Sequence, residues 1–436
     1  MSLNYKTPDY FRDFQCLGSD CPDTCCQRWE VKLDRSHYHL LQEKMSQDRS
    51  EKELFENYIY VNEQPVTGDH DYAFIRMMDE GRCPMLSKEG LCSLHDRYGI
   101  EPLGDVCAFY PRVISRCGPD MELSGALSCP EVARLCLLSK QPLKTTRFNI
   151  SQLPRSKDYP IQRELPQNPF DYYADNFRLV RQKLLELAAY EAVPLNVRLY
   201  ALVELAQRMS IYYHRDCKAI DGQRLERDLQ QSLDRGNLKN IQNYLEQDNS
   251  VNLLAMLVVR AILEIKITQF PDEKLSRMAK NIFTDSATGS ANSILDVPIE
   301  DVQKAYDALR QLVSPVMNEK IDRYFTRYLC NCLFREWYFT MPDTFTYMQM
   351  LLIRMAMLRF LFYSEPRLIP LLKEYEQADS KDQSHLQAEL DSLAITLIYN
   401  FARAVDQNLS FLQLVYTAIS EQDMFNFDYS LAFVKF

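Results

Sequence analysis

The sequence has 436 residues, of which 46% are hydrophobic and 25% charged, as is usual for a soluble globular protein. Its formal net charge of −10 argues against a nucleic-acid-binding surface, which would be basic. The first twenty residues lack an apolar signal region, and no segment approaches the roughly 20 uninterrupted apolar residues of a membrane span. We therefore expect a cytoplasmic protein that does not insert into a membrane and keeps its thiols reduced.

Cysteine and glycine are concentrated in the first third of the chain. Ten of the 13 cysteines lie between Cys16 and Cys136, and eight of the 11 glycines precede Ala126. Between Pro154 and Pro169, four prolines stand among charged and amide residues. Proline has no amide donor and biases the preceding residue away from helix, so this segment predicts an extended connector. We predict a cysteine-rich domain over residues 1–148, a linker over 149–169 and a second domain over 170–436.

The first predicted domain mixes strands and helices. Residues 29–34 alternate like a short strand. Asp34 or Ser36 is then suited to cap a helix that runs to about Met45. Residues 72–94 suggest a small hairpin region with a turn at 87–90. We expect a small α+β fold here.

The cysteines of this domain are candidate metal ligands. Thiolates that converge on a metal come from loops and turns, and Pro22, Pro84 and Pro130 stand beside cysteines where they would fix a ligand loop. Cys117 and Cys136 are equally suited to an apolar core. The candidate ligands are Cys16, Cys21, Cys25, Cys26, Cys83, Cys92, Cys107 and Cys129.

Several alternatives to a metal, and more than one metal, fit these cysteines. Disulfides are disfavoured in a reducing compartment, and buried free cysteines are common singly but unusual as a group of ten. Structural zinc usually takes four ligands from two CxxC-like knuckles, and no such pair occurs. The irregular spacing and the surplus of thiols favour an iron–sulfur cluster, with zinc as the alternative.

Beyond the linker, apolar residues recur at spacings of three or four, which predicts an all-helical domain. Cys330 and Cys332 are two residues apart in one such segment, so they point about 200° away from each other and are expected in the core. The predicted helices span 170–189, 197–213, 224–247, 251–268, 299–338, 345–363, 368–376, 386–404 and 410–420.

Several enzyme signatures are missing from the sequence. There is no glycine-rich dinucleotide or P-loop fingerprint and no HExxH or GxSxG motif. The CxxxCxxC motif of radical enzymes begins at Cys21 and Cys25, but Arg28 occupies its third position. The thiolate centre is therefore the candidate active site.

The motifs that carry a family resemblance begin with Pro8-Asp9-Tyr10 and the cysteine segment from Cys16 to Trp29. They continue through CPML at 83–86, Leu91-Cys92, Val106-Cys107, YPR at 110–112 and LSCPEVARL at 127–135. A looser likeness follows in NFRLVRQKLLELA at 176–188 and RYLCNCLFREWYF at 327–339. In these segments the sequence resembles the flagellin lysine N-methyltransferases (FliB-type).

The resemblance implies methyl transfer from S-adenosylmethionine to lysine ε-amines of flagellin, with a [4Fe–4S] cluster in place of the usual methyltransferase sheet. An open iron site could hold the amino and carboxylate groups of the donor. Trp29 and Tyr110 are candidates to face its sulfonium with an aromatic ring, and Arg112 to hold its carboxylate. The alternatives are aromatic packing over the metal loops and a structural salt bridge. No residue is singled out as the base that takes the proton of the lysine.

A different class of protein also fits the sequence. A non-enzymatic helical adaptor or metal carrier with a structural zinc or iron thiolate site would show the same cysteines and the same helical pattern. Both alternatives share one predicted architecture. It is mainly α, with a small cysteine-rich α+β domain followed by a larger all-α domain and no Rossmann sheet.

Overall fold

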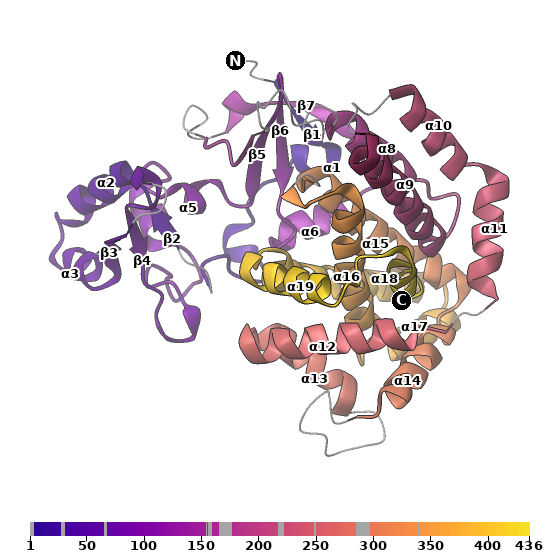
Figure 1. Ribbon diagram of the computed structural model, residues 1–436. Coiled ribbons are helices and arrows are strands. Elements are labelled where there is room, and N and C mark those ends of the chain that lie inside the picture. Colours follow the sequence, from indigo (N-terminus) through magenta and orange to yellow (C-terminus); the bar gives the residue numbers. More distant parts are fainter. Residues whose placement is uncertain are drawn as a thin grey trace. The chain divides into compact units, whose positions relative to one another are not determined.

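The computed structural model describes residues 4–27, 31–64, 68–153, 155, 159–164, 177–216, 222–247, 250–284, 297–337 and 340–436. The chain divides into two compact units. The first comprises Met1–Val132 and Thr145–Leu165, and the second comprises Ala133–Lys144 and Pro166–Phe436. Helices predominate among the described residues, as predicted (Figure 1).

The first unit contains a five-stranded sheet that the sequence analysis did not predict. Its strand order is β7-β1-β6-β5-β8, and β5 and β6 form an antiparallel hairpin, whereas β1 runs parallel to β6. Gly118 turns this hairpin with a φ of 63°, which suits glycine because it has no Cβ. The strands are β1 (Asn4–Pro8), β5 (Arg112–Cys117), β6 (Asp120–Gly125), β7 (Thr145–Asn149) and β8 (Arg163–Glu164).

A second, three-stranded sheet of the same unit carries the predicted strand and helix. It has the order β2-β4-β3, with β2 at Val31–Leu33, β3 at Ile59–Val61 and β4 at Ala73–Ile75. Asp34 caps the helix after β2, since its carboxylate accepts from the backbone N–H groups of Ser36 and His37 at 3.0 and 3.1 Å. The helices of the unit are α1 (Asp9–Arg12), α2 (Arg35–Met45), α3 (Arg49–Tyr58), α4 (Ser93–Tyr98) and α5 (Asp105–Phe109).

The described residues of the second unit form helices and no strand, in agreement with the predicted all-α domain. The chain passes from the first unit to the second within α6 (Pro130–Leu137). The further helices are α8 (Phe177–Ala188), α9 (Leu195–Asp216), α10 (Gly222–Ser232), α11 (Arg235–Glu246), α12 (Leu253–Gln269), α13 (Glu273–Thr284), α14 (Ile299–Gln311), α15 (Pro315–Arg335), α16 (Thr344–Tyr363), α17 (Leu368–Gln377), α18 (Ser380–Phe401), α19 (Leu409–Glu421) and α20 (Phe427–Val434).

Two of the predicted helices are each divided in the structure. The segment 224–247 forms α10 and α11, because Asp234 starts a new helix by accepting from the backbone N–H of Asn237 at 3.0 Å. The segment 299–338 forms α14 and α15, with Ser314 as the cap and Pro315 at the first helical position. Helices α13 and α20 were not predicted.

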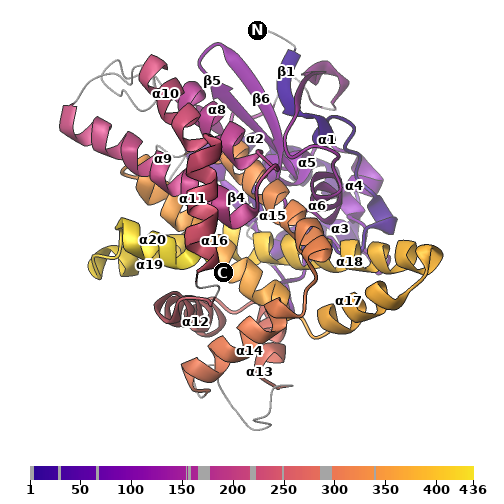
Figure 2. The same ribbon diagram turned by 90° about the vertical axis from the view of Figure 1, so that its right-hand side faces the viewer.

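Helix α16 is the central core helix of the second unit. It has the length and hydropathy of a membrane-spanning helix, but all of its residues are buried inside the protein. It packs against α9, α12, α14, α18 and α20 (Figure 2). Two of its buried residues are the arginines Arg354 and Arg359, each 5% exposed.

Candidate functional site

The eight candidate cysteines lie in loops or at the starts of short helices of the first unit. Cys16 to Cys26 belong to the segment after α1, Cys83 follows a short turn, and Cys92 directly precedes α4. Cys107 lies in α5, where its backbone N–H donates to Gly104 at 2.9 Å. Cys129 directly precedes α6. Thiols at such positions can turn toward a shared centre.

Backbone contacts join the first cysteine cluster to the second. The N–H of Cys83 donates to the carbonyl of Cys26 at 3.1 Å, beside a β-bridge between Gln27 and Arg82. Cys92 is brought close to Cys83 by a further bridge between Leu86 and Cys92. The turn between these two residues is at 87–90, as predicted.

Five thiols form what we call the central group: Cys25, Cys26, Cys83, Cys92 and Cys107. A hydrogen bond with Cys25 raises the pKa of Cys26, and burial and the neighbouring Cys107 and Cys92 raise it further. Burial raises the pKa of Cys83 to about 11, and Cys92 and Cys25 add to this. Although part of Cys107 is exposed, the protein around its thiol raises its pKa, as do Cys92, Cys83 and Cys25. The thiols of Cys26, Cys83, Cys92 and Cys107 therefore favour their protonated form, and each interacts electrostatically with Cys25.

The other three candidate cysteines are connected to the central group through Cys25. Burial raises the pKa of Cys129 to about 12, and the thiols of Cys21 and Cys25 contribute. Burial also raises the pKa of Cys21, with contributions from Cys16 and Cys25. Cys25 thus acts on the pKa of six other candidate thiols. Each of the eight candidate thiols thus interacts electrostatically with at least one other.

The remaining described cysteines lie in the protein core. Cys117 is buried in β5 and donates to the Glu122 carboxylate at 3.4 Å. The Cys136 thiol lies 3.6 Å from the backbone carbonyl of Arg327. Cys330 and Cys332 are fully buried in α15, as expected from their spacing. Cys217 lies outside the described residues.

The residues considered for donor binding have different surroundings. Trp29 lies outside the described residues. The hydroxyl group of Tyr110 is 3.0 Å from that of Ser128, the neighbour of Cys129. The guanidinium of Arg112 lies over the ring of Phe14, 5.0 Å from its centroid. None of the ion pairs between described residues includes Arg112.

One further group in the first unit has the spacing of a metal site, and the sequence analysis did not find it. Asp34, His37 and Asp105 have ligand atoms within 4.8 Å of one another, and no other such group of three or more occurs among the described residues. Asp34 also caps α2, and Asp105 pairs with Arg155 at 2.8 Å. These polar atoms therefore already have partners within the protein.

The second unit contains a cavity of about 1030 Å³ with a charged lining, which the sequence analysis also missed. Its walls come from the start of α9, the end of α11, the junction of α14 and α15, and the end of α16. The basic lining residues are Lys140, Arg198, Arg310, Arg323, Arg327 and Arg359. The acidic ones are Glu191, Glu246, Asp307, Glu319 and Asp322.

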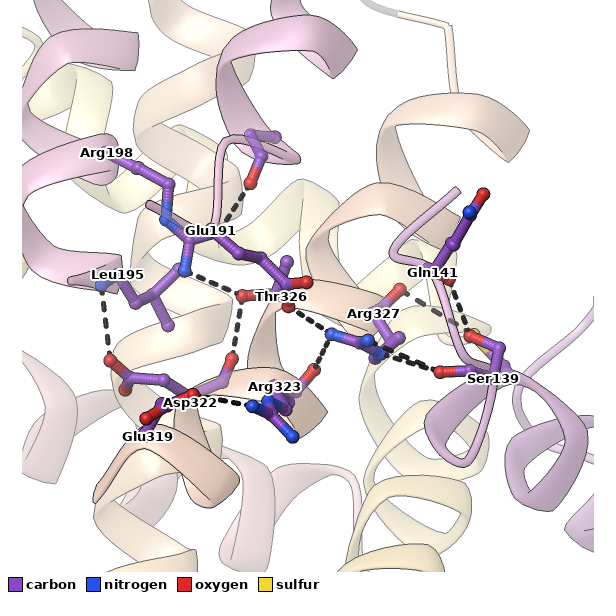
Figure 3. A network of polar contacts seen from close by, with 12 residues as sticks. Ser139, Gln141, Glu191, Leu195, Arg198, Glu319, Asp322, Arg323, Thr326 and Arg327 are labelled. Carbon is purple, nitrogen blue, oxygen red and sulfur yellow. Dashed lines mark hydrogen bonds and ion pairs between the residues drawn. The ribbon is translucent and has the colours of Figure 1, made fainter. Parts of the chain in front are cut away.

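Figure 3 shows how one wall of this cavity is held. Arg327 forms an ion pair with Glu191 and donates to the carbonyl of Ser139 at 3.3 Å. Arg198 donates to the hydroxyl group of Thr326 at 2.9 Å. The carboxylate of Asp322 accepts from the backbone N–H of Leu195, at the start of α9, at 3.2 Å. This wall is therefore fixed by α15 and the start of α9.

The second unit is also the part of the chain that matches a known family. The family model described as the FliB lysine N-methylase C-terminal domain matches residues 181–433. The chain belongs to this family. The match covers every cavity-lining residue except Lys140.

Curated relatives are similar over shorter stretches. The lysine-N-methylases of Salmonella choleraesuis and Salmonella typhimurium are each 25% identical over 171 residues, which is 37% of this chain and 40% of the relative. The flagellar biosynthetic protein FliU of Salmonella muenchen is 26% identical over 131 residues, or 30% of this chain and 75% of that protein. The chain thus spans less than half the length of the two lysine-N-methylases that it matches. No solved structure matches.

Proposed function

We propose that this protein transfers methyl groups from S-adenosylmethionine to lysine ε-amino groups of flagellin. The family match over 181–433 is the observation that carries the proposal, and the names of the Salmonella relatives support it. The missing nucleotide-binding glycine motifs agree with a methyltransferase that is not built on a Rossmann sheet.

The proposal includes a cysteine-ligated iron–sulfur centre in the first unit. A [4Fe–4S] cluster takes four thiolates, and the central group offers five. Zinc is the alternative for the same residues. When bound, an iron–sulfur centre would supply a Lewis-acidic iron. The protein's own part is to keep the thiols close together and partly shielded from water, so that metal binding releases protons from groups whose pKa is raised.

For the donor, we propose that Trp29 and Tyr110 offer aromatic faces to the positively charged sulfonium. The hydrogen bond between Tyr110 and Ser128 would hold that ring beside Cys129. Arg112 is proposed to hold the donor carboxylate, since its guanidinium packs on Phe14 and is not used in an ion pair with a described residue. The lysine amine must lose its proton before it attacks, and a desolvating site would favour the neutral amine.

The direct test is to incubate the purified full chain with flagellin and S-adenosylmethionine and to count added methyl groups by mass spectrometry. Omission of the donor is the control. Methylated lysines that require both the donor and the protein are the expected result. A protein with an intact metal centre that adds no methyl group to flagellin would instead favour the adaptor or metal carrier. A colourless protein with stoichiometric zinc would contradict the cluster but not the methylation.

A further inference from the structure

Arg359 is a buried charge whose hydrogen-bonding capacity is only partly used. Its side chain lines the cavity of the second unit, and the residue is 5% exposed. Its Nε and one of its terminal nitrogens, Nη1, are buried and have no hydrogen-bond partner in the described structure. A buried guanidinium without a full set of partners is costly, because its charge has lost its water. Such a group is explained if a ligand completes it.

The groups around Arg359 leave positive charge uncompensated. Arg198, Arg310 and Arg359 all act on the carboxylate of Asp322, and its pKa is raised by burial in spite of them. Arg310 also lies 3.6 Å from Asp307. With Arg327 and its partner Glu191, which also acts on Arg198, four guanidinium groups therefore face three carboxylates in this part of the cavity. One negative charge would balance them.

The neighbouring arginines have free donors as well. Arg198 is 2% exposed, and its two terminal nitrogens donate to the Ala188 carbonyl and to Thr326 at 2.6 and 2.9 Å. Its Nε lacks a hydrogen-bond partner, and Nη1 of Arg310 makes no hydrogen bond although it lies 3.6 Å from Asp307. The starts of α9 and α15 also line the cavity, and helix N-termini favour anions.

We infer that this cavity binds a small anionic ligand whose carboxylate or phosphate group is anchored by Arg359. A guanidinium matches the planar oxygen pair of a carboxylate or phosphate and can bind it with two hydrogen bonds. The volume of about 1030 Å³ leaves room for more than the anionic group itself. The five acidic residues of the lining disfavour a polyanion, so the ligand carries one such group or a compensating positive charge.

Calorimetry on the full chain can distinguish a phosphate ligand from a carboxylate ligand. One probe is inorganic phosphate. The other is S-adenosylhomocysteine, which carries a carboxylate, compared with methylthioadenosine, which lacks the amino-acid end. Binding of phosphate alone would identify a phosphate site. Binding of S-adenosylhomocysteine but not of methylthioadenosine, weakened by Arg359→Gln, would identify a carboxylate ligand in this cavity. Binding that Arg359→Gln leaves unchanged would belong to the donor site proposed beside Arg112 and would count against this inference. Pyrophosphate should bind no more tightly than phosphate.

The decisive comparison is between Arg359→Gln and Arg323→Gln. Both remove one positive charge from the cavity lining, but Arg323 is 53% exposed at its side chain and is paired with Glu319 at 2.5 Å. We expect Arg359→Gln to weaken binding about 10- to 100-fold and Arg323→Gln to change it less than about threefold. Arg310→Gln, at a less buried side chain, is the second variant should Arg359→Gln not fold, and it should weaken binding as well.

The inference is overturned if none of the probes binds the wild-type protein, or if a folded Arg359→Gln protein, or Arg310→Gln in its place, binds as tightly as the wild type. Either of these failures would leave the proposed flagellin methylation standing, because that activity is measured separately with flagellin and S-adenosylmethionine.

Discussion

The hydroxyl group of Tyr328 donates to both carboxylate oxygens of Asp406, at 2.9 and 3.1 Å. Tyr328 lies on α15, and Asp406 ends a short π-helical segment, Ala402–Asp406, that follows α18. The guanidinium of Arg354 reaches the same carboxylate at 3.2 Å and also binds Glu336. A buried polar network thus joins three helical segments of the second unit.

This network predicts a pH dependence of stability. Burial raises the pKa of Asp406 to about 6, against a usual value of 3.8. The folded protein therefore binds this proton more readily than the unfolded chain. The resulting stability is complete below pH 3.8 and is lost as the pH rises through about 6. Between pH 7 and pH 5, the free energy of unfolding of the wild type should rise by roughly 1 kcal/mol relative to that of Asp406→Asn.

Denaturant titrations of both proteins at several pH values measure this difference. The comparison with Asp406→Asn removes the effects of all other titrating groups. A difference that stays constant from pH 5 to pH 7 would show that Asp406 keeps an ordinary pKa.

Substitution of Arg354 should strongly lower the free energy of unfolding. In Arg354→Met, the cation that contacts both Glu336 and Asp406 is gone while their carboxylates stay buried. Breaking such a pair costs about 3–5 kcal/mol of unfolding free energy. Arg367→Met is the control, because that side chain is 71% exposed and pairs with Glu365 at 2.8 Å. Its loss should cost less than about 1 kcal/mol. Equal effects of the two substitutions would contradict this account.

Cys25 should matter more for metal binding than any core cysteine. Cys25→Ser removes the thiol that acts on six other candidate ligands, and the expected result is loss of most iron, or of zinc in the alternative, from the purified protein. Cys330→Ser is matched in chemistry but lies in the core of α15. It should retain the metal. Metal analysis and the visible absorption spectrum give the measurement, and a fully loaded Cys25→Ser protein would exclude this residue from the centre.

Substitution of Gly104 should lower both the stability of the protein and its metal content. A Cβ at this position would lie 2.6 Å from Leu33 Cδ2 and 2.9 Å from the backbone oxygen of Lys32. Gly104→Ala therefore forces a backbone shift, at a cost of about 1–3 kcal/mol. Since the Gly104 carbonyl accepts from Cys107, the shift should also reduce metal content. Gly222→Ala meets only Leu179 at 3.4 Å and should be tolerated. Calorimetric melting and metal analysis measure the two effects. A Gly104→Ala protein with the melting temperature and metal content of the wild type would contradict this prediction.

Local patterns explain which elements could be predicted. Asp34 caps α2 by accepting from Ser36 and His37, which are close to it in the sequence. The apolar spacing of α8 and of α9 is likewise visible within the sequence of each helix. The five-stranded sheet could not be found in this way, because pairs such as Lys6 with Glu122 are far apart in the sequence. The breaks at Asp234 and Ser314 were overlooked although their capping residues were visible.

The same distinction applies to the candidate sites. The density of cysteines in the sequence singled out the eight candidate thiols. Only the fold shows that Cys25 interacts with six of the others. Arg354 and Arg359 both interrupt the apolar run of α16, which is a signal that buried charge is present. The sequence cannot tell which of the two is satisfied, because Glu336 and Asp406 come from other segments. That difference separates a structural arginine from a ligand-binding one.

Helix α16 also affects how the protein is synthesised. It packs on α9, which leaves the ribosome early, and on α20, which contains residues 427–434. The part of its apolar surface that α20 covers therefore stays uncovered until Val434, 71 residues after Tyr363, has been translated. The core of the second unit can therefore be completed only once α20 has been translated. A nascent chain that stalls before α20 would expose part of a helix with the hydropathy of a membrane segment, and such exposed apolar surface favours aggregation.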